Sequence, residues 1–249
     1  MPQYNINPQI IEKSIEELEF ILKCVKRRGE TSENPKTILI GGWAVDAYNP
    51  WYGSVDIDLV TNSEMKSDLK YYLKKLRNYG SYELDGGFNT ISKMTEYGEI
   101  IIDFVKRERY TFVGREEKLD FKIPKEQTVI KGIRGRISAV VPTRSMLMLL
   151  KLKASWDRTH RIEHGRSIDI DWERSKRIKD YADIIALIDP VHGGRDIDTG
   201  FLGEKFVDLY CLRLYRCRNL PILKYPDHPA ALGHHYPYRL CRMRDSCDR

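Results

Sequence analysis

Hydrophobic residues recur along most of the chain at spacings that indicate first a helix and then short strands and helices. Apolar side chains three and four positions apart over residues 8–28 predict an amphipathic helix. The apolar run over 37–40 predicts a strand, and residues 43–48 predict a short helix that ends before a proline. Strict alternation over 55–60 predicts a second strand.

The rest of the pattern predicts further strands followed by helices. The elements are a helix over 63–78 capped by Ser63, paired strands over 89–95 and 99–105, strand-like residues over 128–141, a helix from Thr143 to about Asp157 and a helix over 172–188. This order predicts an α+β fold, a small mixed sheet flanked by helices and then a helical lobe. We divide the chain into an N-terminal helix and loop (1–36), a core (37–141), a helical C-terminal lobe (142–199) and a tail with little periodicity (200–249).

Composition argues against a membrane-spanning or secreted protein. The chain has 249 residues, of which 41% are hydrophobic, enough for a sizeable core. No apolar run approaches the roughly 20 residues that span a bilayer, and the first residues lack the basic and apolar regions of a secretory signal. Cys24, on the first predicted helix, is expected to be a small buried residue in a reducing compartment. We therefore expect a cytoplasmic protein without a membrane partner.

The net charge of +6 and the pI of about 8.9 would suit a nucleic-acid partner. However, residues 211–249 hold eight Lys and Arg against three Asp, so the rest of the chain is close to neutral. A near-neutral body gives RNA no clear electrostatic advantage. The tail also carries four of the five cysteines, in two pairs six positions apart, which is wider than zinc modules use. Three interpretations stay open: a Cys/His metal site, a poorly ordered appendage, or a segment that replaces the natural C-terminus after a reading-frame change.

Three aspartates on predicted strands are the strongest chemical signal. Asp56 and Asp58 are two positions apart, so both should project from the same face of one strand. Asp103 lies within an apolar run, where a carboxylate is costly to bury unless it is paired or binds a metal. Carboxylates on neighbouring strands can hold two divalent cations. Each feature alone is more often structural, but their combination is much more specific.

A double glycine precedes these aspartates. Gly41 and Gly42 stand between a predicted strand and a predicted helix, where backbone can approach a phosphate closely. Gly41-Gly42, thirteen intervening residues, Asp56-Ile57-Asp58-Leu59 and a later single Asp resemble the DNA polymerase β-type nucleotidyltransferase superfamily. The string around the double glycine is also similar to aminoglycoside and lincosamide adenylyltransferases.

A second block resembles the AbiEii-type nucleotidyltransferases. It comprises Lys151, Ala154 and Arg158, followed by Lys179-Asp180 and Asp183. The resemblance implies that the charged residues among them face the active site. From the residues alone, Lys151 can meet triphosphate charge and Asp180 can orient it. We interpret Lys153, Lys176 and Lys179 as charge on solvated helix faces.

These resemblances imply transfer of a nucleoside monophosphate from an NTP, such as ATP, to an acceptor hydroxyl, with release of pyrophosphate. Mg²⁺, or Mn²⁺, in a two-metal site would be held by Asp56, Asp58 and Asp103, and Gly41, Gly42 and Ser54 would cradle the triphosphate. Nucleotide binding would further use Lys151, Arg158 and Asp180. The AbiEii resemblance implies an RNA acceptor, such as a tRNA 3′ end, and an antitoxin partner. The alternatives are a small hydroxyl acceptor such as an aminosugar, or a non-catalytic nucleotide- or RNA-binding module. The last is motivated by Tyr52, which stands where the family often has Arg.

Overall fold

The structure, a computed structural model, describes residues 7–31, 33, 35–51, 53–81, 89–106, 109–111, 118–120 and 123–205. Tyr52 and the four cysteines of the C-terminal tail lie outside the described residues, so the predictions made for them stay predictions.

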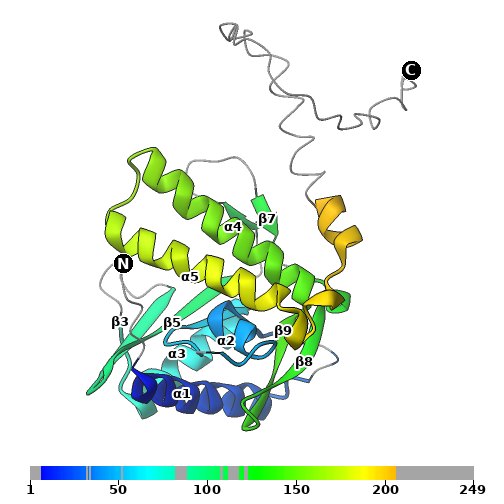
Figure 1. Ribbon diagram of the computed structural model, residues 1–249. Coiled ribbons are helices and arrows are strands. Elements are labelled where there is room, and N and C mark those ends of the chain that lie inside the picture. The colour runs from blue at the N-terminus through cyan, green and yellow to red at the C-terminus, as the bar shows by residue number, and fades with distance from the viewer. Residues whose placement is uncertain are drawn as a thin grey trace, which may run out of the picture. The chain divides into compact units, whose positions relative to one another are not determined.

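The predicted helices and strands occur in the predicted order, and the structure adds short strands at residues 80–81, 109–111 and 118–120 (Figure 1). The labelled helices are α1 (Pro8–Arg27), α2 (Gly41–Asp46), α3 (Ser63–Arg77), α4 (Arg144–Glu163) and α5 (Ile170–Ile188), and residues 199–205 are also helical. The strands are β1 (Ile38–Ile40), β2 (Ile57–Thr61), β3 (Gly80–Ser81), β4 (Thr90–Thr95), β5 (Gly98–Lys106), β6 (Arg109–Thr111), β7 (Lys118–Asp120), β8 (Thr128–Ile133) and β9 (Ile137–Pro142). Short 3₁₀ turns span Lys125–Gln127, Pro190–His192 and Gly194–Asp196.

The main sheet has the strand order β1-β2-β5-β4-β3. Strands β2 and β5 are parallel, and every other pair in this sheet is antiparallel. A mixed sheet of this kind, combined with helices, confirms the predicted α+β fold. Two separate hairpins, β6–β7 and β8–β9, complete the described strands.

Some element boundaries differ from the predictions. Asn62, rather than Ser63, caps α3 by accepting a hydrogen bond from the backbone N–H of Met65. The strand-like residues 128–141 form a hairpin, because the chain turns at Arg134 and Gly135, both with positive φ. Helix α4 begins at Arg144, directly after its N-cap Thr143, and continues beyond the predicted end near Asp157 to Glu163.

The central strands are buried on both faces by different helices. Leu39, Ile57 and Leu59 belong to a core cluster that includes apolar residues of α1 and α3, among them Ile15, Leu18, Leu69 and Leu73. Val60 lies in a second cluster with Met146 and Leu149 of α4. Since side chains alternate along a strand, Asp58 shares the face of Val60 and therefore faces the side of α4. In Figure 1, α4 and α5 run side by side above the sheet.

Two composition-based expectations can be compared with the structure. Cys24 is buried in the first cluster, as predicted. Among the helices of the described residues, none is both long and apolar enough to cross a membrane.

Candidate active site

The double glycine forms the first two residues of α2, directly after the end of β1. Gly41 has φ +70°, and a side chain at this position would collide with the carboxylate of Asp58. A Cβ at Gly42 would lie 2.6 Å from Oγ of Ser54 and 3.2 Å from Nζ of Lys179. Glycine is therefore required at both positions, because polar groups of the site pack directly against the backbone. The predicted phosphate-binding turn and the predicted carboxylates thus lie at the same place.

The sheet brings two of the predicted aspartates side by side. Asp58 of β2 is the register partner of Asp103 on the parallel strand β5. Thr90 on β4 is the partner of Asp103 on its other side, and its hydroxyl donates to Oδ1 of Asp103 at 2.6 Å. Asp56 lies just before β2 rather than within it. The prediction that Asp103 stands on a strand next to the Asp-x-Asp segment is therefore confirmed.

Electrostatics differ sharply between the two members of the Asp-x-Asp segment. Burial and the negative charges of Asp103 and Asp56 raise the pKa of Asp58 to about 7. For Asp56 burial acts in the same direction, but Lys176 and Lys179 outweigh it and hold the pKa below its ordinary value. The site thus contains one carboxylate with an ammonium partner and, beside it, an excess of negative charge centred on Asp58.

This donor set suits a hard divalent cation, since carboxylate oxygens are the ligands that Mg²⁺ and Mn²⁺ prefer. Asp56, Asp58 and Asp103 are the residues that would hold it. Within the part of the chain that the structure describes, no three or more His, Cys, Asp or Glu side chains are gathered closely enough to bind a metal as they stand. Asp56 is instead bound by Lys176, whose Nζ lies 2.5 Å from Oδ2.

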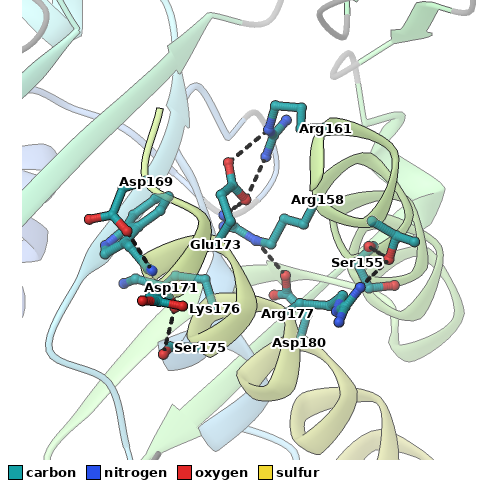
Figure 2. Close-up of polar contacts among 12 residues, drawn as sticks. Ser155, Arg158, Arg161, Asp169, Asp171, Glu173, Ser175, Lys176, Arg177 and Asp180 are labelled. Atoms are coloured by element: carbon teal, nitrogen blue, oxygen red, sulfur yellow. Dashed lines mark hydrogen bonds and ion pairs between the residues drawn. The ribbon is translucent and has the colours of Figure 1, made fainter. Parts of the chain in front are cut away.

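Helices α4 and α5 contribute a largely buried ionic network, whose Lys151 acts electrostatically on Asp58. Figure 2 shows the part of this network around Arg158, Glu173 and Asp180. Nζ of Lys151 lies 3.2 Å from Oδ1 of Asp180 and 2.5 Å from Oδ2 of Asp183. Arg158 donates from Nε to Oδ2 of Asp180 at 2.9 Å and from Nη1 to Oε2 of Glu173 at 3.1 Å. The structure therefore brings the predicted residues Lys151, Arg158 and Asp180 together. Burial would lower the pKa of Lys151, but Asp183 and Asp180 outweigh it, so this pKa is raised.

Two lysines that we interpreted as surface charge point into the site instead, so this interpretation was wrong. Lys179 is only 9% exposed, and its Nζ donates to Oγ of Ser54 at 3.3 Å. Lys176 binds Asp56 as described above. The third lysine of this group, Lys153, is also largely buried and pairs with Asp157 at 2.6 Å. The interpretation failed because α5 has polar residues on several sides, so its sequence does not reveal which side faces Asp56 and Ser54.

Glu173 is a member of the network that the sequence analysis missed. It accepts hydrogen bonds from Arg158 and from both Nε and Nη2 of Arg161. Burial would raise its pKa, but these hydrogen bonds outweigh it and lower the pKa below 4.5. Its spacing from Lys176 and Asp180, three and seven positions along one helix, was the available signal.

Comparisons with known proteins add two distant structural neighbours. No protein-family model and no curated protein matches the chain. The crystal structure of ANT(2″)-Ia in complex with adenylyl-2″-tobramycin is similar with a TM-score of 0.40 and 16% identity, over 86% of this chain and 100% of the other. Lincomycin-bound LnuA, a lincosamide antibiotic adenylyltransferase, is similar with a TM-score of 0.38 and 16% identity, over 69% of this chain and 94% of the other. Similarity of this degree does not indicate a function for this chain.

Proposed function

We propose that this protein is a divalent-cation-dependent nucleotidyltransferase that moves a nucleoside monophosphate from an NTP to an acceptor hydroxyl, with release of pyrophosphate. The observation that carries the proposal is the contact between the Gly41 backbone and the carboxylate of Asp58, which is itself in register with Asp103. A turn suited to phosphates and a pair of carboxylates suited to a cation meet there. Phosphoryl transfer needs this combination, because its catalysis consists mainly of positioning and charge stabilisation.

Each residue of the site has a definable role in this reaction. Gly41, Gly42 and Ser54 would line the triphosphate through backbone N–H groups and a hydroxyl. Asp56, Asp58 and Asp103 would hold Mg²⁺ or Mn²⁺, which when bound neutralises phosphate charge and favours the deprotonated acceptor hydroxyl. Asp103, already a hydrogen-bond acceptor for Thr90, would also orient that hydroxyl.

The positive charges of the α4–α5 network would attract the phosphates from a distance, and its ion pairs would hold these charges in place. Lys151 contributes a buried positive charge beside Asp58, and this charge is fixed in place by Asp180 and Asp183. Arg158 holds Asp180 in turn. Preorganised charge of this kind stabilises a transition state without a reorganisation cost at the moment of reaction.

Label transfer tests the proposal and identifies the acceptor class. The full chain is incubated with Mg²⁺ and each α-labelled NTP, with total RNA in one arm and small polyols and aminosugars in the other. Label in RNA supports an RNA-modifying, toxin-like enzyme, for which an antitoxin would be sought. Label on a small hydroxyl compound supports the adenylyltransferase alternative.

Two variants decide whether any transfer comes from this site. Asp58→Asn should abolish the label, since it removes the central carboxylate. Asp171→Asn, whose carboxylate is 94% exposed on α5, should leave the label unchanged. Absence of label in both arms, together with absent NTP binding, would overturn the proposed function, whereas NTP binding without transfer would favour a non-catalytic nucleotide-binding module.

A further inference from the structure

Helix α5 delivers a positive charge to a carboxylate that the proposed reaction needs for its cation. Nζ of Lys176 lies 2.5 Å from Oδ2 of Asp56, and the two side chains are 20% and 19% exposed. One turn later, Lys179 donates to Ser54. Both residues of α5 therefore extend toward the strand β2 side of the site, and Figure 2 shows Lys176 on this helix beside the buried network.

The partners of Lys176 differ from those of the other buried cations nearby. Lys151 and Arg158 are each bound by two carboxylates of α5, so their positions are fixed within the helical pair. Lys176 instead forms its ion pair across to the sheet side of the site. Its ammonium also lies 5.6 Å from the ring centroid of Trp172, one turn earlier on α5. An aromatic face attracts an ammonium group without the directional hold of a carboxylate, so Trp172 would still attract the Lys176 ammonium once it left Asp56.

An ammonium group and a divalent cation compete for Asp56, because both are attracted to the same carboxylate and repel each other. An NTP that arrives with the cation brings several negative charges, which offer the displaced ammonium new acceptors. Lysine suits such an exchange, since its charge is compact and its stem is flexible.

We propose that Lys176 exchanges partners when the site is loaded: it holds Asp56 in the free protein, releases it to the divalent cation and then binds phosphate oxygens of the NTP. This inference rests on the proposed function. It assigns to Lys176 a place in the nucleotide-binding machinery and makes α5 the element that couples cation binding to NTP binding.

Binding of Mn²⁺ alone tests the first half of the exchange. The full chain, Lys176→Gln and Arg174→Gln are titrated with Mn²⁺ and followed by its electron paramagnetic resonance signal. Lys176→Gln should bind Mn²⁺ roughly three- to tenfold more tightly. In wild type, Lys176 occupies Asp56 for most of the time, and the affinity for Mn²⁺ is reduced to the fraction of time in which Asp56 is available. Arg174→Gln removes the same charge from α5 at a position that is 56% exposed and paired with Asp171, so its affinity should stay within about twofold of wild type.

Binding of a non-hydrolysable NTP analogue at saturating Mn²⁺ tests the second half. Here Lys176→Gln should bind about tenfold more weakly, the contribution of one charge-assisted hydrogen bond. Opposite changes in Mn²⁺ and NTP affinity distinguish an exchange of partners from a structural role, which would weaken both. Circular dichroism of each variant confirms that the fold is retained.

The outcomes separate this inference from the proposed function. Unchanged or weaker Mn²⁺ binding by Lys176→Gln, or no Mn²⁺ binding by any of the three proteins, would overturn the exchange. If Mn²⁺ binding tightens as expected but wild type binds no NTP, the competition at Asp56 stands, whereas the transfer to phosphate and the proposed function both fail. If wild type binds NTP and Lys176→Gln binds it equally well, only the transfer to phosphate fails.

Discussion

Gly41 shows how strictly a single position of the site is determined. Its φ of +70° is strained for any residue with a Cβ, and a Cβ there would collide with Asp58. Gly41→Ala should therefore lower the free energy of unfolding by about 1–3 kcal/mol and abolish nucleotide transfer. Gly132→Ala is the matched control, because a Cβ at Gly132 has no atom within 4 Å and no positive φ to oppose it. Denaturant unfolding and label transfer measure both effects, and equal stability of the two variants would contradict this account.

The lowered pKa of Glu173 predicts that the stability of the folded protein depends on pH. Its pKa is lower in the folded protein than its ordinary value of 4.5, since hydrogen bonds from Arg161 and Arg158 outweigh the effect of burial. A lowered pKa contributes stability above pH 4.5, and this contribution is lost as the pH falls through the folded-state pKa. Glu173→Gln should therefore be less stable than wild type at pH 7, and the difference should shrink below about pH 4.5. Thermal unfolding between pH 3 and 7 measures it, with Asp171→Asn as a control that should follow wild type. A constant difference across this range would refute the assignment.

At the scale of single residues, sequence patterns predicted the positions of those side chains whose surroundings follow from the periodicity of their own strand. Asp58 and Asp103 could be placed because strand alternation fixes the face of each side chain, and an apolar run fixes the strand. Lys176 could not be placed in the same way. Its partner Asp56 is 120 positions away in sequence, and their contact depends on how α5 is rotated toward the residues that precede β2.

Sequence patterns predicted strand-like residues over 128–141 but missed the turn that divides them into the hairpin β8–β9. Its turn places Arg134 at φ 50°, a conformation that Asn or Gly usually adopts, so the turn carries no strong sequence signal. A tertiary contact stabilises it: Arg134 donates to both carboxylate oxygens of Asp46 on α2, at 3.1 and 3.0 Å. This bidentate pair fixes the hairpin to the helix that follows the double glycine.

The same contact yields a prediction for element packing. Asp46 is 1% exposed, so Asp46→Asn should lower the free energy of unfolding by about 1–3 kcal/mol through loss of a buried, charge-assisted pair. Glu12→Gln removes one partner of Arg136 at a pair whose side chains are 56% and 36% exposed, and it should cost less than about 1 kcal/mol. Urea unfolding of both variants compares them. If Glu12→Gln were the more destabilising change, the hairpin would be fixed by the α1 side and not by α2.

At the scale of the whole described chain, α5 is bound to the core by contacts at its middle and at its C-terminal end, which determines how the helical lobe and the sheet behave together. Near its middle, Lys176 binds Asp56 and Lys179 donates to Ser54. At its end, the side chain of Asn49 in the core donates to the backbone carbonyl of Ala186 at 3.1 Å. Within the lobe itself, Arg144 of α4 donates to the backbone carbonyl of Leu187 at 2.8 Å. The lobe over 142–199 that we separated by sequence therefore shares buried contacts with the 37–141 core.

This arrangement predicts that the core and the lobe open as one unit. Asn49→Ala leaves a buried carbonyl of α5 without its donor and should destabilise the protein by about 1–3 kcal/mol. Because the two parts are coupled, amide hydrogen exchange should accelerate by a similar factor, about tenfold, in β2 and in the second half of α5. Ile185→Ala, at a position of α5 that is 59% exposed, should change neither region appreciably. Acceleration confined to α5 would show that the lobe opens independently, and in that case the exchange of partners by Lys176 would follow opening of the lobe and would not require movement of its side chain alone.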